Sequence, residues 1–575
     1  MNRDESRSVN SHKFLAASKL LLTLLSGFEL AVLLVTYGYQ QSFPQLFQLL
    51  ISRLEGLLVL IFFANLILNY LFSGIRHRDI NMTSLDIMIL LAILLLSISI
   101  KTAAVLIVGR QLIVWGQRAA RISWIKHFID ILIARPAQLI MVSFLSIIIV
   151  GTIFLTLPAA TQNGEGAPLL TALFTATSAT CVTGLIVVDT GSYFSTFGQI
   201  VIVILIQIGG LGIMTLSTSL ALIFGRRFGL REQATLQDIF DVPDAVTLKR
   251  IIIYIIKLTF WVELVGVVIL FWKLGPYVKG FYRELFTAIF HSISAFCNAG
   301  FCLFPDSLAR FRNDWVVNFT VSGLIIIGGI GFAVVANLID RENFRYGFRH
   351  FIRRLTIHTK IVLILTFTLI SVGTLIIFFF EFDNALLELP TGEKLLAAFF
   401  QSVTLRTAGF NTIELGHLRN ITIFMMIIWM FIGAAPGSTG GGIKVSTLGV
   451  LLLTIKALLT GRREVEIFRR TIPQPIVYKS IAIFLVASAL LASLFALLLV
   501  SEDANFLILL YESTSAFGTV GLSLGVTPHL TSYGQMLIIS MMYIGRIGPL
   551  TLAYAVGEKT QKVAIKYPDG RIMVG

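Results

Sequence analysis

The chain has 575 residues, of which 56% are apolar and 13% charged, with a mean hydropathy of +0.87 and a formal net charge of +14. Repeated apolar runs of about 18 residues or more predict an integral membrane protein rather than a string of soluble domains. The positive charge could indicate a nucleic-acid partner, but Lys and Arg gather in short segments between the apolar runs, so none is expected.

Residues 1–135 contain three apolar runs before any repeat begins. The run over 14–38 is too long for a signal peptide and predicts a retained helix. The run over 56–74 ends before a basic turn at 76–78, which indicates the cytoplasmic side. For the later loops to face outward, either the third run, 87–116, is a hairpin or the N-terminus lies outside. The second option would place Arg76 and Arg78 outside, so the hairpin is favoured. The basic segment 117–135 is expected to lie along the cytoplasmic surface.

The third run also allows a different hypothesis. Its basic residues and those that follow are Lys101, Arg110, Arg118 and Arg121, which suggests a voltage sensor. A sensor helix would repeat Arg at every third position, and these residues do not follow that spacing. A long helix that leaves the membrane into a basic linker is the simpler interpretation.

From residue 136 onward one pattern occurs four times: a long apolar helix, a short pore segment, a glycine loop and a second long helix. The repeats are assigned to 136–249, 250–355, 356–475 and 476–575. Their helices and pore segments are predicted at 137–157, 168–180 and 197–223; 250–273, 283–296 and 315–338; 357–381, 392–405 and 420–458; and 476–500, 504–517 and 533–556.

The glycine loops have one register. Their central triplets are Val182-Thr183-Gly184, Asn298-Ala299-Gly300, Thr407-Ala408-Gly409 and Thr519-Val520-Gly521. An aromatic residue precedes each glycine by ten positions: Phe174, Phe290, Phe399 and Tyr511. Backbone carbonyls can replace the water around an ion only where side chains stay clear, and glycine permits the backbone angles that this requires. The loops are therefore predicted to form an ion-selectivity filter. The alternative is that each glycine only turns a re-entrant hairpin.

The distribution of charge predicts which side these loops face. Lys and Arg concentrate in the segments that follow each repeat's second helix, 225–250, 340–360, 456–479 and 557–575, whereas 159–195 and 502–531 contain none. This is the positive-inside pattern, with the glycine loops outside. Two outer segments fit it less well: 273–313 has five basic residues, and 382–419 has Lys394, Arg406 and Arg419.

The second helices carry an aligned small-residue motif, which begins at Ile208-Gly209-Gly210 in the first repeat. Close helix packing or a bend explains such residues. In the third repeat the motif continues as a segment that cannot remain helical: Pro436, Gly437, Ser438, Thr439, Gly440, Gly441, Gly442, Ile443 and Lys444. Because 420–435 is too short to cross a membrane, this segment is predicted to be a mobile gate beneath the filter. A cytoplasmic loop is the alternative.

Arg546 occupies the motif position that holds Gly210, Gly329 or Ala434 in the other repeats. A guanidinium inside the membrane needs a partner or water. The expected partners are carbonyls of the glycine-rich segment or an acidic residue such as Glu512. The alternative is an arginine that reaches to the membrane surface, although its position in the middle of the helix disfavours this.

These features together resemble a known family. The four helix–pore loop–helix units, the loops VTGL, NAGF, TAGF and TVGL, the GSTGGGIK segment and Arg546 are similar to the Trk/Ktr/HKT potassium-transport superfamily, and within it to the KtrB and TrkH membrane subunits. The resemblance covers about 136–575. Residues 1–135 go beyond the usual short N-terminus of KtrB and stay unassigned.

The resemblance implies an all-α integral membrane protein with four repeats around a pseudo-fourfold pore, extra N-terminal helices and a location in the plasma membrane. It implies a homodimer, surrounding lipids, and a cytosolic nucleotide-binding regulatory subunit of the KtrA or TrkA kind. Gly184, Gly300, Gly409 and Gly521 become filter glycines. The glycine-rich segment becomes the gate, with Arg546 as its electrostatic companion. Family members with Ser in the first loop tend toward sodium, so Gly184 favours potassium.

The expected function is therefore K⁺ uptake, with K⁺ as the substrate and no covalently bound cofactor. A sodium-permeable or sodium-coupled transporter of the same fold and a non-conducting membrane sensor are the alternatives. An enzyme is not expected, because His291, Glu263 and Glu512 are scattered and form no acid–base or metal set. The three cysteines, Cys181, Cys297 and Cys302, are expected to be small apolar fillers.

Overall fold

The computed structural model describes residues 2–38, 44–72, 89, 100–119, 136–223, 245–339, 348–549 and 551–552. Apart from one short antiparallel hairpin, β1 (Glu466–Ile467) with β2 (Arg470–Thr471), the elements in these ranges are helices. The all-α class is therefore confirmed. Outside the described residues lie most of the amphipathic segment predicted over 117–135, most of the basic segment 225–250, the first part of 340–360 (residues 340–347) and the whole of 557–575.

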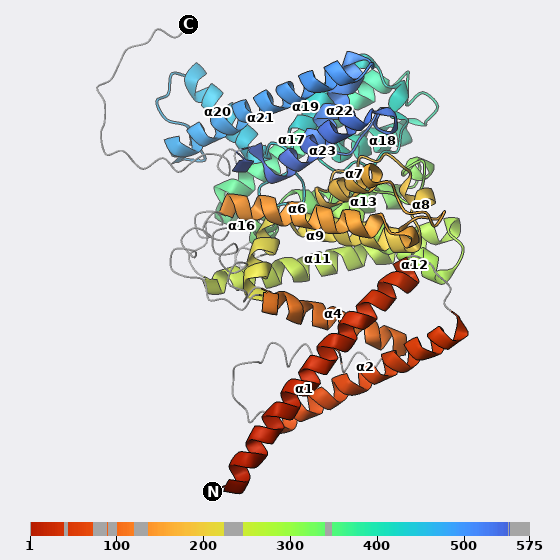
Figure 1. Cartoon of the computed structure of the whole chain (residues 1–575). Coiled ribbons are helices and arrows are strands. Elements are labelled where there is room, and N and C mark those ends of the chain that lie inside the picture. The colour runs from red at the N-terminus through yellow and green to blue at the C-terminus, as the bar shows by residue number, and fades with distance from the viewer. Residues whose placement is uncertain are drawn as a thin grey trace.

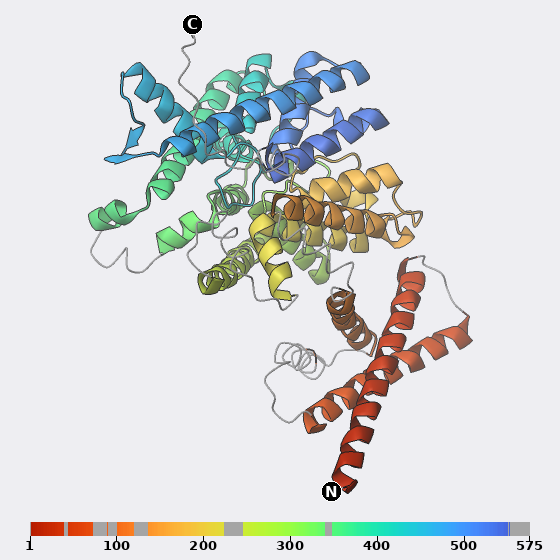
Figure 2. The ribbon, with the colours of Figure 1, turned by 60° about the vertical axis from the view of Figure 1, so that its left-hand side comes forward.

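In the described part of residues 1–135, three helices form a bundle: α1 (Asn2–Leu33), α2 (Gln45–Phe72) and α4 (Ile100–Ala119), with a π-helical turn η1 (Leu34–Gly38) after α1. The bundle lies to one side of the four repeats (Figures 1 and 2), and η1 contacts the 3-10 turn η2 (Pro158–Ala160). Its core consists of Leu22, Leu58, Phe62, Ala104 and Ile107. The first half of the hairpin predicted over 87–116 is almost entirely outside the described residues, so that prediction stays open.

Each repeat begins with a long apolar helix: α6 (Pro136–Leu155), α11 (Ala245–Leu274), α17 (Ile357–Glu381) and α21 (Gln474–Ser501). Their apolar stretches have mean hydropathies between 2.1 and 2.8 and are long enough to cross a bilayer. With α2, five described helices meet this test, or six if the bent pair in repeat 2 counts as one span. The chain is therefore built to sit within a membrane.

The short helix that follows in each repeat is the pore helix: α7 (Leu169–Thr180), α12 (Phe281–Phe296), α18 (Thr391–Thr404) or α22 (Phe506–Gly518). These helices have 12 to 16 residues. At 1.5 Å per residue they measure about 18–24 Å, which is shorter than a bilayer core of about 30 Å. Each can therefore enter the membrane only part of the way.

The second helices are α9 (Thr196–Ile223), α13 with α14 (Trp315–Gly329 and Phe332–Ile339), α19 with α20 (Asn420–Phe431 and Val445–Leu459), and α23 (Ser532–Ile547). Each pore helix packs on the second helix of the preceding repeat: α12 on α9, α18 on α13, α22 on α19, and α7 on α23. The last pair joins repeat 1 to repeat 4 and closes a circle. The pseudo-fourfold arrangement is thus confirmed.

In each repeat, the second long helix is interrupted by a break. The sequence motif predicted such a break only in repeat 3. Gly212 has φ 77° inside α9, and α13 and α14 meet at Gly331 (φ 91°) with a bend of 100°. In repeat 4, α23 ends at Gly548 (φ 92°). The expectation of continuous helices in repeats 1, 2 and 4 was wrong, because the last glycine of each motif takes a left-handed backbone angle that interrupts the helix.

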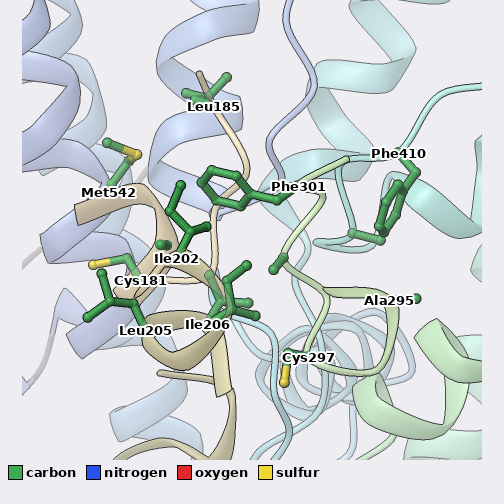
Figure 3. Close-up of a cluster of buried hydrophobic side chains, with 14 of the residues drawn as sticks. Cys181, Leu185, Ile202, Leu205, Ile206, Ala295, Cys297, Phe301, Phe410 and Met542 are labelled. Carbon is green, nitrogen blue, oxygen red and sulfur yellow. The ribbon is translucent and has the colours of Figure 1, made fainter. Parts of the chain in front are cut away.

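The main hydrophobic core surrounds the glycine loops (Figure 3). Leu185, Phe301 and Phe410, each directly after a loop glycine, are almost completely buried in it. Cys181 and Cys297 lie in the same cluster as free thiols, as expected of small apolar fillers. Cys302 is free but only partly buried.

Candidate functional site: a ring of backbone carbonyls

The four glycine loops share one unusual backbone conformation. The loop glycines all have positive φ, at 94°, 69°, 80° and 93° for Gly184, Gly300, Gly409 and Gly521. The residue two positions earlier also has positive φ, at 56°, 61°, 65° and 51° for Val182, Asn298, Thr407 and Thr519. Left-handed backbone is uncommon outside glycine and most costly for β-branched residues, so its fourfold repetition shows a conformation imposed by the surrounding fold.

The loops meet one another in a closed ring. A Cβ atom built on each loop glycine would lie closer than 3.0 Å to a carbonyl oxygen of the next loop: Gly184 to Ala299, Gly300 to Ala408, Gly409 to Val520, and Gly521 to Thr183. The last of these contacts returns to the first repeat. We call the four triplets that contain these residues the glycine ring. Its glycines are required both by their backbone angle and by the approach of the neighbouring carbonyl.

Backbone N–H groups of the ring donate hydrogen bonds to the pore helices. The backbone N–H groups of Thr183, Ala299 and Val520 donate to the carbonyls of Ser178, Ser294 and Ser515, at 2.7 to 2.8 Å. In repeats 1 and 4 the serine hydroxyl also accepts from the loop glycine, since the N–H groups of Gly184 and Gly521 each lie 3.1 Å from Oγ. Repeat 3 has Val403 at this position, so this hydroxyl is lost there.

The ring is chemically suited to a desolvated cation. The C-terminal ends of α7, α12, α18 and α22 lie directly before the ring, and a helix C-terminus carries about half a negative charge. In the part of the chain that the structure describes, no three His, Cys, Asp or Glu side chains gather to hold a metal ion. The ligands that the ring could provide to a cation are therefore backbone carbonyl oxygens, as in carbonyl-lined ion filters.

The glycine-rich loop, Pro436–Lys444, lies directly against the ring. A Cβ atom on Gly440 would lie closer than 3.0 Å to Thr407 Oγ1, and one on Gly441 closer than 3.0 Å to Thr519 Oγ1. The N–H group of Gly441 donates to Thr519 Oγ1 at 3.1 Å. The break between α19 and α20 in repeat 3 therefore places this loop beside two of the four ring segments.

The loop is also bonded on its other sides. The N–H group of Gly433 donates to the carbonyl of Ile443 at 2.8 Å, which ties the two ends of the loop together. Thr439 N donates to the carbonyl of Gly328 at 3.2 Å, and Lys444 Nζ donates to that of Gly440 at 2.6 Å. Ser438 Oγ donates to the carbonyl of Ala435 at 2.6 Å. These bonds satisfy polar backbone that no regular helix could satisfy at membrane depth.

Arg546 joins this loop to a different repeat. Its side chain is only 6% exposed, and it donates from Nη1 to the carbonyl of Thr439 and from Nη2 to that of Gly209 on α9. A carbonyl of the glycine-rich loop is thus a partner, as one prediction stated, and the side chain does not reach the surface. Glu512, the acidic alternative, instead accepts from Thr527 Oγ1. The second acceptor, Gly209, had no signal in the sequence.

The loop that follows the ring in repeat 2 is hydrogen-bonded to repeat 3. In repeat 2, the N–H group of Leu308 donates to the carbonyl of Asn411 at 3.1 Å, and Ser307 Oγ accepts from Asn411 N at 3.2 Å. Asp306 and Arg310 pair within the same loop at 2.7 Å. Burial raises the pKa of Asp306, but hydrogen bonds from Arg310 outweigh it and hold the pKa below its ordinary value. Repeats 2 and 3 are therefore linked outside the ring.

Fold and ring together define the class: a membrane protein in which four re-entrant loops surround one central path. The model of the TrkH family, described as a cation transport protein, matches residues 125–562. This chain belongs to that family. It is 43% identical to Ktr system potassium uptake protein B of Vibrio alginolyticus, over 76% of this chain and 94% of that protein. It is 36% identical to the potassium/sodium uptake protein NtpJ of Enterococcus hirae, over 76% of this chain and 97% of that protein.

The fold is also found in a solved structure. The crystal structure of the potassium transporter TrkH from Vibrio parahaemolyticus matches with a TM-score of 0.57 at 16% identity, covering 94% of this chain and 97% of that chain. Residues 1–124, before the family match, are more than a fifth of the sequence. The structural likeness therefore extends into the N-terminal helices, which the resemblance to KtrB left unassigned.

Proposed function

We propose that this chain takes up K⁺ across the membrane as the ion-conducting subunit of a Trk/Ktr-type system, with the glycine ring as its selectivity filter. The observation that carries the proposal is the closed ring of four loops, in which a carbonyl of each loop lies against the glycine of a neighbouring loop; these carbonyls belong to Thr183, Ala299, Ala408 and Val520. Carbonyl oxygens at the end of four helix C-termini can replace the water around a cation. The relative named as a potassium uptake protein supports K⁺ as the ion.

The glycine-rich loop is the proposed gate. It lies against Thr407 and Thr519 of the ring, and Arg546 holds it from repeat 4. A loop of glycines can move with little steric cost, and a fixed guanidinium repels cations. Gating then consists of breaking the bonds between Arg546 and the loop, which opens the path below the ring.

The proposed partners are a second copy of this chain, a cytosolic nucleotide-binding regulatory subunit and membrane lipids. The relative from Vibrio alginolyticus is named as part of a system, which supports an assembly of several subunits. Among the described residues, Arg353 and Arg354 on α16 (Phe348–Arg354) and Arg469 and Arg470 at the β1–β2 hairpin are exposed. Lys360, in the first turn of α17, lies over the ring of Phe468 at 5.6 Å and donates from Nζ to the carbonyl of Arg353 at 3.3 Å, so it links the end of α16 to the hairpin. Together they form a basic surface suited to an acidic partner.

Sodium transport is the second candidate, because one relative is named for both potassium and sodium. The experiment that decides between them is flux into proteoliposomes that contain the purified protein. Rb⁺ and K⁺ uptake that exceeds Na⁺ uptake is the expected result. Comparable Na⁺ flux would favour the second candidate, and no flux of any of these ions would favour a non-conducting sensor.

A further inference from the structure

One basic residue of the outer half has no role in the account above. Arg406 directly precedes Thr407 of the glycine ring and is only 5% exposed. Its Nε and Nη2 atoms are buried without a hydrogen-bond partner among the described residues. Lys394, in the first turn of the same pore helix, is equally buried, but its Nζ donates to the carbonyl of Phe382 at 2.7 Å. A buried and unpaired charge destabilises a fold, so Arg406 requires another explanation.

Arg406 breaks the fourfold symmetry of the ring. The residues at the equivalent position, three before the loop glycine, are Cys181, Cys297 and Gly518, and none of them is charged. Cys181 and Cys297 each cap the C-terminus of their pore helix. In repeat 3 the cap is Leu405, and the N–H group of Arg406 donates to the carbonyl of Val403 at 3.1 Å. Repeat 3 therefore carries an arginine directly after the C-terminal cap of its pore helix.

The electrostatic effect follows from this position. Each pore helix presents about half a negative charge at its C-terminus, and a buried guanidinium within one side-chain length of that end opposes this contribution. Because Arg406 is buried, salt in the surrounding water screens its charge poorly. One of the four helices thus opposes cation binding at the ring while the other three favour it.

We propose that Arg406 sets how tightly the glycine ring holds a cation, by weakening K⁺ binding enough for the ion to leave. The inference rests on the proposed function and deepens it, since conduction requires binding that is favourable but reversible. Arg406 then sets the K⁺ affinity of the ring through its charge and is not itself a ligand. What this role requires is a positive charge near the ring, not hydrogen bonds from the guanidinium to the protein.

The test is K⁺ binding to the purified protein, measured by isothermal titration calorimetry with choline as the replacement cation. Arg406→Gln is expected to tighten K⁺ binding about tenfold, the order expected of one unit charge about 10 Å away. Uptake at saturating K⁺ should become slower in the same variant. Arg406→Lys, which keeps the charge, should bind K⁺ as the parent does.

Lys394→Gln is the matched control. It removes a buried charge from the same pore helix, about 15 Å further from the ring at 1.5 Å per residue, and should leave the K⁺ affinity nearly unchanged. Equal or weaker K⁺ binding by Arg406→Gln would overturn the inference, as would equal losses in Arg406→Gln and Arg406→Lys, which indicate a structural role. If the parent itself binds no K⁺, the proposed function fails; if it binds K⁺ and Arg406→Gln changes nothing, only this inference fails.

Discussion

The guanidinium of Arg546 and the carbonyl oxygen of Thr439 are hydrogen-bonded across the boundary between repeats 4 and 3. The same side chain donates to Gly209 of repeat 1, so one buried cation connects three repeats beneath the glycine ring. A charge in this place does two things at once. It bonds the glycine-rich loop to repeats 1 and 4, and in the proposed gating mechanism it repels a cation on the central path.

Arg546→Gln is therefore expected to raise K⁺ flux in vesicles that lack any partner, by about fivefold or more, because a charge at this depth opposes a passing cation by at least about 1 kcal/mol. Deletion of 437–441, which removes the Thr439 acceptor, should act in the same direction. Arg462→Gln, an exposed arginine paired with Glu466 at 2.8 Å, is the control and should conduct as the parent does. If both gate variants insert normally and conduct no faster, the loop is only a structural break.

A second prediction concerns selectivity at the glycine ring. Gly184 has φ 94°, and a Cβ there would lie closer than 3.0 Å to the carbonyl oxygen of Ala299. Gly184→Ser should therefore displace one quarter of the ring and lower the K⁺/Na⁺ flux ratio several-fold.

Gly525→Ser is the matched control for this substitution. Gly525 has nearly the same φ, 91°, but no atom lies within 4 Å of a Cβ built on it. The backbone strain is thus reproduced without the contact to the ring. The filter assignment is contradicted if Gly184→Ser keeps the parental flux ratio, or if both serine variants lower it equally.

The ring could be predicted from the sequence because its requirement is local. A position that needs both positive φ and a nearby carbonyl accepts almost only glycine, and four repeats show this requirement in one register. The breaks at Gly212, Gly331 and Gly548 could not be predicted in this way. A glycine in an apolar helix is compatible with close packing as well as with a break.

Both uses of glycine occur within one motif. Gly209 packs so closely on the carbonyl of Thr180 that a side chain would not fit, whereas Gly212, three residues later, interrupts the helix. What separates them is contact with residues far away in the chain. For the same reason, neither the partner of Arg546 on repeat 1 nor the burial of Arg406 could be predicted from the sequence. The charge pattern counted Arg406 among the outer basic residues.

A third prediction concerns the support of the ring by serine hydroxyls. Ser515 Oγ accepts from the N–H group of Gly521 at 3.1 Å, and both residues are buried. Ser515→Ala leaves that N–H unpaired, which should cost about 1–3 kcal/mol of stability and lower the thermal unfolding temperature in detergent. Ser540→Ala, which removes an exposed hydroxyl bonded to Met536 at 2.9 Å, should have almost no effect. Equal unfolding temperatures of the two variants would show that the hydroxyl is dispensable.

The last prediction concerns the basic surface on α16, at the end of the molecule shared with α20 (Figure 1). Arg353 and Arg354 are exposed there, and reversal of both to Glu should abolish copurification with a soluble regulatory subunit. The parental complex should weaken as salt rises from 0.1 M to 1 M, since the screening length falls from about 10 Å to about 3 Å.

The control for this surface is a matched reversal on the side that the positive-inside pattern predicts to be outer. Arg283 and Arg312 are also exposed, and their change to Glu should leave the complex intact, because a cytosolic partner would not reach that side. The two double variants carry the same change in net charge, so a difference between them reports the place of the charge rather than its amount. Binding that survives reversal at Arg353 and Arg354 and shows no dependence on salt would assign these arginines to anionic lipid headgroups instead.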